Sequence, residues 1–163
     1  MIHGISGAPI PVHLPYAAPI QKASEAANFP PCFAYAIAWR ETISGEQNGS
    51  WNACTVIAPD FGYGLFQITY PFTQPWPPQN WEDPFENATL ALAHFLVPGL
   101  NYFVERGLSG NPLVLCTAAG FNSGNETAWD NHLLGNVDIG TTNGYASSVL
   151  GNYQRLIAGS NPA

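Results

Sequence analysis

The sequence predicts a mainly α fold, a helical bundle around one central buried helix, with one small β excursion. Three observations predict it. Residues 31–39, in a helix expected over 31–43, are apolar on every face, which is typical of a helix buried on all sides. Asp83, Pro84 and Glu86 form a strong helix start, with a capping acid, a proline at the first helical position and a glutamate three residues after the cap. Residues 64–70 give the one short strand-like run.

The expected helices are separated by proline, glycine and asparagine. Pro30 and Pro31 separate a first helix from the central one, and residues 44–62 and 71–78 are typical of loops. The helices are expected over about residues 19–28, 31–43, 84–97 with a continuation past Pro98 to 106, 113–121, 126–134 and 144–157.

One domain is expected, because 163 residues with 46% hydrophobic content can bury a substantial core. Residues 1–19 are rich in proline and show no periodicity. We therefore expect a Pro-rich N-terminal arm that packs on, or projects from, a single domain of residues 20–163. Residues 1–15 have neither the basic cluster nor the apolar stretch of a secretory signal, so no such signal is expected there.

The charge balance excludes several classes of protein. Four Lys and Arg against eleven Asp and Glu give a formal net charge of −7, which lacks the basic footprint of a nucleic-acid-binding protein and disfavours anionic membranes. No apolar run is long enough to span a membrane. Cys32, Cys54 and Cys116 lack metal-ligand spacing, and the histidines are scattered, so neither a metal nor another cofactor is expected. The state of the three cysteines stays open: they form either one disulfide with one free thiol, or three buried thiols.

Glu41 is the most informative single residue. It lies four residues after Ile37 and eight after Phe33, at the end of the apolar run, in a chain with only 9% charged residues. Loss of water raises the pKa of a carboxyl, and an acid that keeps its proton near neutral pH can protonate a leaving group. The alternatives are a structural glutamate paired with a neighbour such as Arg40, or one that points into solvent at the helix end.

Four short motifs follow one another along the chain. They are Arg-Glu-Thr at 40–42, Gly-Tyr-Gly-Leu-Phe-Gln-Ile at 62–68, Ala-Ala-Gly-Phe-Asn-Ser-Gly at 118–124, and Asp-Ile-Gly-Thr-Thr at 138–142 with Tyr145-Ala146 after it. In this order they resemble the goose-type lysozyme and soluble lytic transglycosylase superfamily, over about residues 33–157. The resemblance implies an α+β lysozyme-like fold with the β-hairpin at the active-site cleft, and cleavage of peptidoglycan.

The resemblance assigns roles residue by residue. It implies that Glu41 is the general acid, since a sugar alkoxide leaves poorly without a proton. Asp60 is the candidate that positions the attacking water, with Glu46 as a weaker one. Amides suit hydrogen bonds to an N-acetyl group, glycines permit close backbone approach, and aromatic rings can wall a sugar. The expected substrate-binding residues are Tyr63, Gly64, Gln67, Thr69, Phe121, Asn122 and Tyr145.

The chain also departs from the pattern. Asp60 lies two residues nearer the glycines than the matching aspartate, Thr69 occupies the position of a second aspartate, and Phe121 replaces a tyrosine. Three alternatives to a hydrolase therefore stay open. One is a lytic transglycosylase that uses Glu41 alone, another is a non-catalytic glycan-binding or virion module with the same fold, and the third is a chitinase.

The expected partner is the glycan strand of peptidoglycan, and the expected state is a monomer without nucleic-acid or membrane partners. Expected locations are extracellular, at a cell wall or in a phage virion. Because a chain at −7 is repelled by an anionic wall at low salt, we expect either tethering to a virion or larger assembly, or an acidic working environment.

Overall fold

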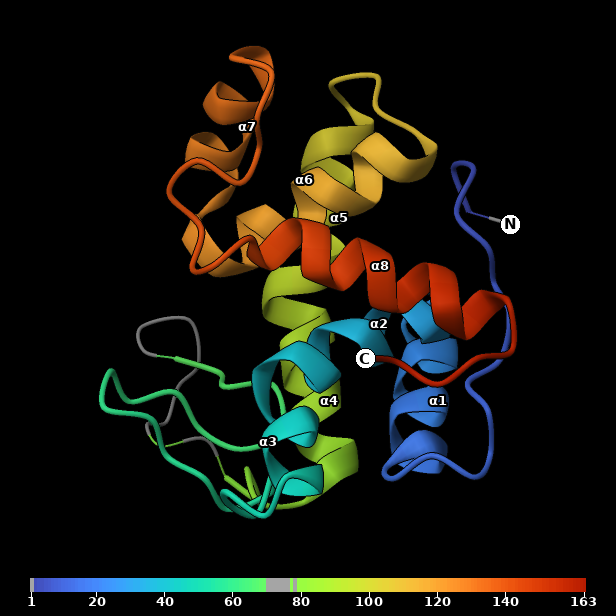
Figure 1. Ribbon diagram of the computed structural model, residues 1–163, viewed down its shortest axis with the longest axis vertical. Coiled ribbons are helices and arrows are strands. Elements are labelled where there is room, and N and C mark those ends of the chain that lie inside the picture. The colour runs from blue at the N-terminus through green and yellow to red at the C-terminus, as the bar shows by residue number, and fades with distance from the viewer. Residues whose placement is uncertain (1, 70–76, 78) are drawn as a thin grey trace.

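The computed structural model describes residues 2–69, 77 and 79–163, and these residues are mainly helical, which confirms the predicted class. Helix α2 (Pro31–Ala38) lies at the centre with every residue buried, as the all-round apolar pattern predicts (Figure 1). It continues without a break into a π-helical turn, η1 (Trp39–Ile43), and then into α3 (Ser44–Gln47). The helix thus runs slightly beyond the expected end at residue 43.

Helices α1 (Ala17–Ala26) and α8 (Tyr145–Ile157) pack against α2, and α8 crosses in front of it in Figure 1. Phe33 of α2 stacks on Phe29 with ring centroids 5.3 Å apart and meets Tyr153 of α8 edge-on at 6.1 Å. The central helix is therefore packed against its direct predecessor α1 and against α8, which is more than 100 residues away in the chain.

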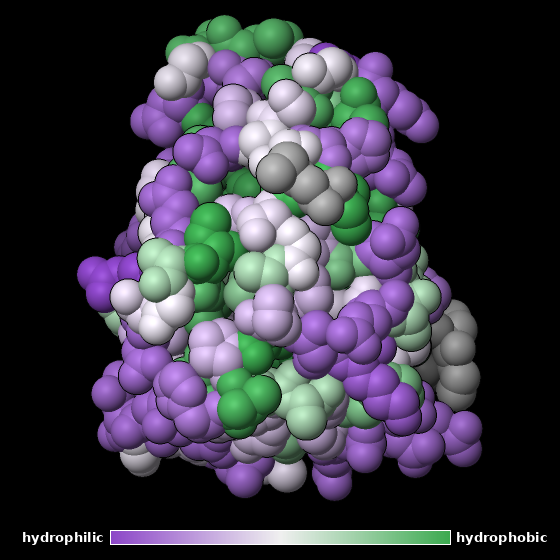
Figure 2. All heavy atoms as spheres, turned by 90° about the vertical axis from the view of Figure 1, so that its right-hand side faces the viewer, coloured by the Kyte–Doolittle hydropathy of each residue, from purple (hydrophilic) through white to green (hydrophobic). Residues whose placement is uncertain are grey.

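The N-terminal arm packs on the domain and does not project from it. Ile5 and Ile10 are buried. The Ser6 amide donates to the Tyr153 hydroxyl at 2.7 Å, and the Cys32 thiol donates to the Pro9 carbonyl at 3.3 Å. Figure 2 shows the face that carries the arm and α1, where residues of intermediate and high hydropathy occupy the middle between hydrophilic margins.

Helices α4 (Pro84–Ala91) and α5 (Val97–Val104) form one rod through a second π turn, η2 (Leu92–Leu96). Asp83 caps α4 as predicted, since its carboxylate accepts from the Phe85 and Glu86 amides at 2.9 and 3.0 Å. An interruption was expected at Pro98, whose ring clashes with the carbonyl four residues earlier. The rod instead continues, because the wider π turn falls at that carbonyl and relieves the clash.

Helices α6 (Gly110–Ser123) and α7 (Asn125–Leu133) complete the bundle, and α6 packs on α5, α7 and α8. Gly124, with φ +89°, makes the turn between α6 and α7. Gly120 lets the two helices meet closely, because a Cβ there would lie 2.3 Å from Asn125 Oδ1.

The expected strand at 64–70 is a compact turn among the described residues. An isolated antiparallel bridge joins Tyr63 to Ile68, which flank the turn at 64–67, and a second one joins Tyr63 to Ile57. A regular β-hairpin at this place stays a prediction. Residue 70 and the expected loop at 71–78, except Pro77, lie outside the described residues. In the described part of the chain, no helix is both long enough and apolar enough to cross a membrane.

Candidate active site

A cleft of about 610 Å³ opens at the π turn η1, which directly follows α2. Its walls come from η1, the loop before the Gly-rich turn, η2, the end of α6 and the start of α8. Most of the predicted site residues line it together: Glu41, Asp60, Gln67, Thr69, Phe121, Asn122 and Tyr145. Tyr63 and Gly64 are not among its lining residues.

Glu41 is half-buried in this cleft, inside the π turn η1. A π turn takes one more residue than an α turn, so it changes which face the residues after Ala38 present. Burial raises the pKa of Glu41 from its ordinary 4.5 to about 7. A hydrogen bond from Tyr145 and the charge of Arg40 oppose that rise, and the charge of Asp60 adds to it. A large share of this carboxyl therefore keeps its proton at neutral pH.

Tyr145 is the direct partner of this acid. Its hydroxyl donates to Glu41 Oε1, and its ring, only 3% exposed, packs at the start of α8. The Arg40 guanidinium lies 5.5 Å from the ring centroid and donates to the Thr142 carbonyl at 3.3 Å. Tyr145 was expected as a wall for a sugar ring, but so little of it is exposed that it acts on the cleft through its bond to Glu41.

The Gly-rich turn is joined to the acid-bearing helix by buried polar contacts. The Thr42 hydroxyl, next to Glu41 in the chain, donates to the Leu65 carbonyl at 2.7 Å. Asn87 of α4 is buried and accepts from the Phe66 amide at 2.8 Å, while its Nδ2 donates to the Tyr63 carbonyl at 3.0 Å. The turn is therefore fixed between η1 and α4.

Within the turn, the glycines serve packing. Gly64 has φ +67°, and a Cβ there would lie 2.6 Å from Asn87 Nδ2. A Cβ on Gly62 would lie 2.8 Å from Gln67 Oε1. The glycine backbone was expected to approach a sugar closely, but it instead lies close to the side chains of Asn87 and Gln67. Tyr63 also packs away from the cleft lining, edge-on to Trp81 with centroids 5.0 Å apart.

Gln67 lines the cleft, but its amide nitrogen is engaged by the loop. Nε2 donates to the Gly64 carbonyl at 2.8 Å and to the Val56 carbonyl at 3.4 Å. These bonds stabilise a residue with φ 49°, in the left-handed region. The expected hydrogen bond to an N-acetyl group would therefore have to use Oε1.

The second carboxylate of the cleft is Asp60. It is exposed and lines the same cavity as Glu41, and its Oδ1 accepts from the Gly62 amide at 3.4 Å. Thr69 also lines this cavity. Glu46, the weaker candidate, lies elsewhere: it accepts from the Tyr16 hydroxyl at 2.9 Å and anchors the arm.

The opposite wall is built from α6 and the loop before α8. Phe121 packs edge-on against Phe95 of η2 at 5.6 Å, and both rings line the cleft. Asn122 Oδ1 accepts from the Thr142 amide at 3.1 Å, so this side chain fixes the 138–144 loop. Asp138 caps α8, accepting from the Ala146 amide at 2.8 Å.

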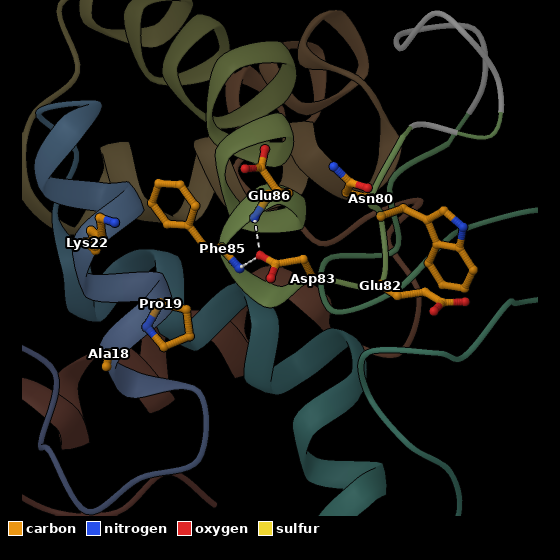
Figure 3. A pocket seen from close by; sticks show the side chains of 9 residues that line it. Ala18, Pro19, Lys22, Asn80, Glu82, Asp83, Phe85 and Glu86 are labelled. Atoms are coloured by element: carbon orange, nitrogen blue, oxygen red, sulfur yellow. Dashed lines mark hydrogen bonds between the residues drawn. The ribbon is translucent and has the colours of Figure 1, made fainter.

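A larger surface cavity of about 810 Å³ lies between α1 and the start of α4 (Figure 3). Lys22 and Phe85 face each other there, with the ammonium 4.5 Å from the ring centroid. Its carboxylates, Glu82, Asp83 and Glu86, are all exposed, and Asp83 is engaged in capping α4. It therefore lacks the partly desolvated acid that distinguishes the Glu41 cleft.

Several cleft residues were not predicted from the sequence. Trp51, Phe95 and Thr142 line the cleft, and Asn87 supports it from below the turn. The one available signal was the aromatic character of Trp51 and Phe95. This signal is weak, because most aromatic side chains belong to the core. Among the described residues, no three His, Cys, Asp or Glu side chains gather closely enough to hold a metal ion.

No protein-family model matches the chain, and no curated protein matches it. The chemistry of the cleft therefore has to be inferred from its own residues.

Proposed function

We propose that this chain is a peptidoglycan-cleaving muramidase of the goose-type lysozyme-like kind, with a lysozyme-like fold. It hydrolyses the β-1,4 bond between N-acetylmuramic acid and N-acetylglucosamine. The observation that carries the proposal is Glu41, a half-buried acid with a pKa raised to about 7 inside a cleft of about 610 Å³. A central buried helix that leads into the π turn carrying this acid, and a Gly-rich turn bonded to that π turn through Thr42, also support the lysozyme-like assignment.

In the proposed reaction Glu41 donates its proton to the bridging oxygen as the glycosidic bond breaks. The leaving sugar departs as a neutral alcohol, and Glu41 becomes a carboxylate that the Tyr145 hydroxyl stabilises. Positive charge develops on the sugar ring left behind, and the carboxylates of Asp60 and Glu41 stabilise it. A water adds to the anomeric carbon, and its proton passes to Asp60.

A lytic transglycosylase is the second candidate, and Asp60 and Thr69 favour it. Asp60 is exposed and bonded to its own loop, and Thr69 offers no carboxylate. With a pKa near 7, Glu41 can act first as acid and then as base. It would take the proton of the substrate's own hydroxyl as that oxygen closes an anhydro ring on the anomeric carbon.

The proposed partner is the glycan strand, and the proposed setting is a cell wall, the extracellular space or a virion. Tethering or an acidic medium would overcome repulsion between the wall and a chain at −7.

Mass spectrometry of the products from purified peptidoglycan, at pH 5 and pH 7, tests these proposals. Reducing-end fragments are expected for a muramidase, whereas fragments lighter by one water would identify a transglycosylase. Glu41→Gln should abolish both while folding is kept. Glu86→Gln is the matched control, because it removes an exposed carboxylate from the other cavity and should leave the activity unchanged.

No products from the wild-type chain at either pH would overturn the enzyme assignment and favour a glycan-binding module. A parallel digestion of soluble chitin oligomers distinguishes a muramidase from a chitinase. Loss of activity in Glu86→Gln, with activity kept in Glu41→Gln, would move the site to the other cavity.

A further inference from the structure

We propose that Trp51 is a sugar-stacking platform, forming an additional saccharide subsite beside Glu41. This inference rests on the proposed function, because it names how the same cleft would hold its glycan. Trp51 lines the cleft and is 45% exposed. Among the tryptophans in the described part of the chain, it is the exposed one, whereas Trp39, Trp81 and Trp129 are half-buried. Leaving so large an apolar ring in water forgoes the stabilisation that burial would give.

The ring is held in place by the backbone under it. A Cβ on Gly45 would lie 2.1 Å from Cζ2 and 2.3 Å from Cε2 of Trp51, with Cη2 next at 2.9 Å. A point beside the Cε2–Cζ2 bond in the plane of the ring would lie farther from Cη2 than this, so the position lies over the ring face. One face of the indole therefore rests on the helix at Gly45 near its Cε2–Cζ2 bond, and the opposite face is free of this contact.

Gly45 has no other evident reason to be glycine. It lies in α3, and its φ is outside the left-handed region. Glycine in a helix costs about 1 kcal/mol relative to alanine. Here the glycine leaves room for the indole, because a Cβ on any other residue at position 45 would overlap the ring.

A hydrogen bond fixes the ring's rotation. Trp51 Nε1 donates to the Thr42 carbonyl at 2.9 Å, and Thr42 follows Glu41 directly in the chain. The indole is therefore bonded to η1, the turn that contains Glu41. This bond sets the relative position of the platform and the acid before any substrate binds. A flat, preorganised apolar face next to a catalytic acid suits the apolar face of a pyranose ring.

Calorimetry on the Glu41→Gln protein tests the platform without catalysis. The probe is the tetrasaccharide of alternating N-acetylglucosamine and N-acetylmuramic acid. Adding Trp51→Ala should weaken binding about five- to tenfold, the size expected for loss of one aromatic contact. Gly45→Ala keeps the indole but displaces it, and should weaken binding similarly. Trp51→Phe keeps a ring and should stay within about threefold of the parent. Trp129→Ala, the matched control on α7, should change affinity less than twofold.

Affinity unchanged by Trp51→Ala or by Gly45→Ala would overturn the platform. Kinetics on peptidoglycan give a second readout: Trp51→Ala should raise KM and leave kcat within about twofold. A fall in kcat at constant KM would also overturn it, assigning Trp51 only the support of Glu41 through Thr42. If the parent binds and Trp51 variants bind equally, this inference alone fails. If no protein binds or cleaves the glycan, the proposed function fails and the platform with it.

Discussion

The raised pKa of Glu41 makes a prediction about stability that does not depend on any substrate. Between pH 4.5 and 7 the folded protein keeps a proton that the unfolded chain has released, so the free energy of unfolding falls as pH rises through this window. The rise in pKa from 4.5 to about 7 corresponds to about 3 kcal/mol. Water still reaches the half-buried carboxyl, which reduces the expected effect to about 2 kcal/mol.

Glu41→Gln removes the titrating group and keeps an oxygen that can accept from Tyr145. We therefore expect the variant to gain about 2 kcal/mol over the wild type between pH 4 and pH 8, with the gain complete above pH 7. Urea unfolding at intervals across this range measures it. With a slope of about 2 kcal/mol per molar urea, the difference between the two midpoints should change by about 1 M.

Glu126→Gln, an exposed glutamate at the start of α7, is the matched control and should follow the wild type at every pH. If the difference in stability between Glu41→Gln and the wild type stays constant from pH 4 to pH 8, Glu41 has an ordinary pKa. The assignment of Glu41 as a neutral-pH acid would then be wrong, whatever the activity assays show.

Tyr145→Phe removes the hydroxyl that favours the Glu41 anion, so the pKa of Glu41 should rise. The alkaline limb of the kcat/KM profile should then move to higher pH, with about tenfold lower activity at the optimum. An unshifted limb would contradict the contact. Asn87→Ala leaves the buried Phe66 amide without its acceptor and should lower the free energy of unfolding in urea by about 2–4 kcal/mol. A decrease below about 1 kcal/mol would show that the turn is stable without this side chain. Asp138→Asn weakens the cap of α8. Burial raises the pKa of Asp138, but hydrogen bonds from Ser147 and Thr141 prevail and lower it below 3.8, so the cost of about 1 kcal/mol should be present at neutral pH and disappear as pH falls below 3.8.

The central helix and the Asp83 cap could be predicted because their signals are local. An apolar run on every face identifies a buried helix wherever it packs, and a cap needs only residues three apart. The same pattern made a desolvated Glu41 one of the open interpretations, beside an ion-paired or solvent-facing glutamate, and the structure supports the desolvated one. Both predictions needed nothing from the rest of the chain.

The π turns and the continuity of the rod could not be predicted in the same way. A π turn is a single wider turn without a repeating pattern, so it leaves no periodic signal in the sequence. Pro98 indicated an interruption of the helix before its continuation to residue 106, because the usual clash assumes α geometry at the preceding turn. Only when η2 is present does the proline become compatible with a continuous helix.

The hydrogen-bond partners of the site residues could not be predicted from the sequence either. Tyr145 lies 104 residues from Glu41, and their contact depends on how α8 crosses α2. Asn87 looks like an ordinary polar residue on a helix, and only its burial next to the Gly-rich turn gives it three backbone partners. Sequence patterns identify which side chains can do chemistry, whereas tertiary contacts decide which of them meet.

The low charge of this chain explains why burial dominates at Glu41. With only 9% charged residues, few neighbours are available to oppose desolvation, and Arg40 is the one lysine or arginine among the described residues that line the cleft. Arg40 is itself partly engaged by the Tyr145 ring and the Thr142 carbonyl, so its charge offsets only part of the rise in pKa. A free guanidinium aimed at Glu41 would hold the carboxyl ionised and remove the proton that glycoside cleavage needs. The contacts of Arg40 with the Tyr145 ring and the Thr142 carbonyl therefore act in the same direction as burial, which is the larger cause of the raised pKa.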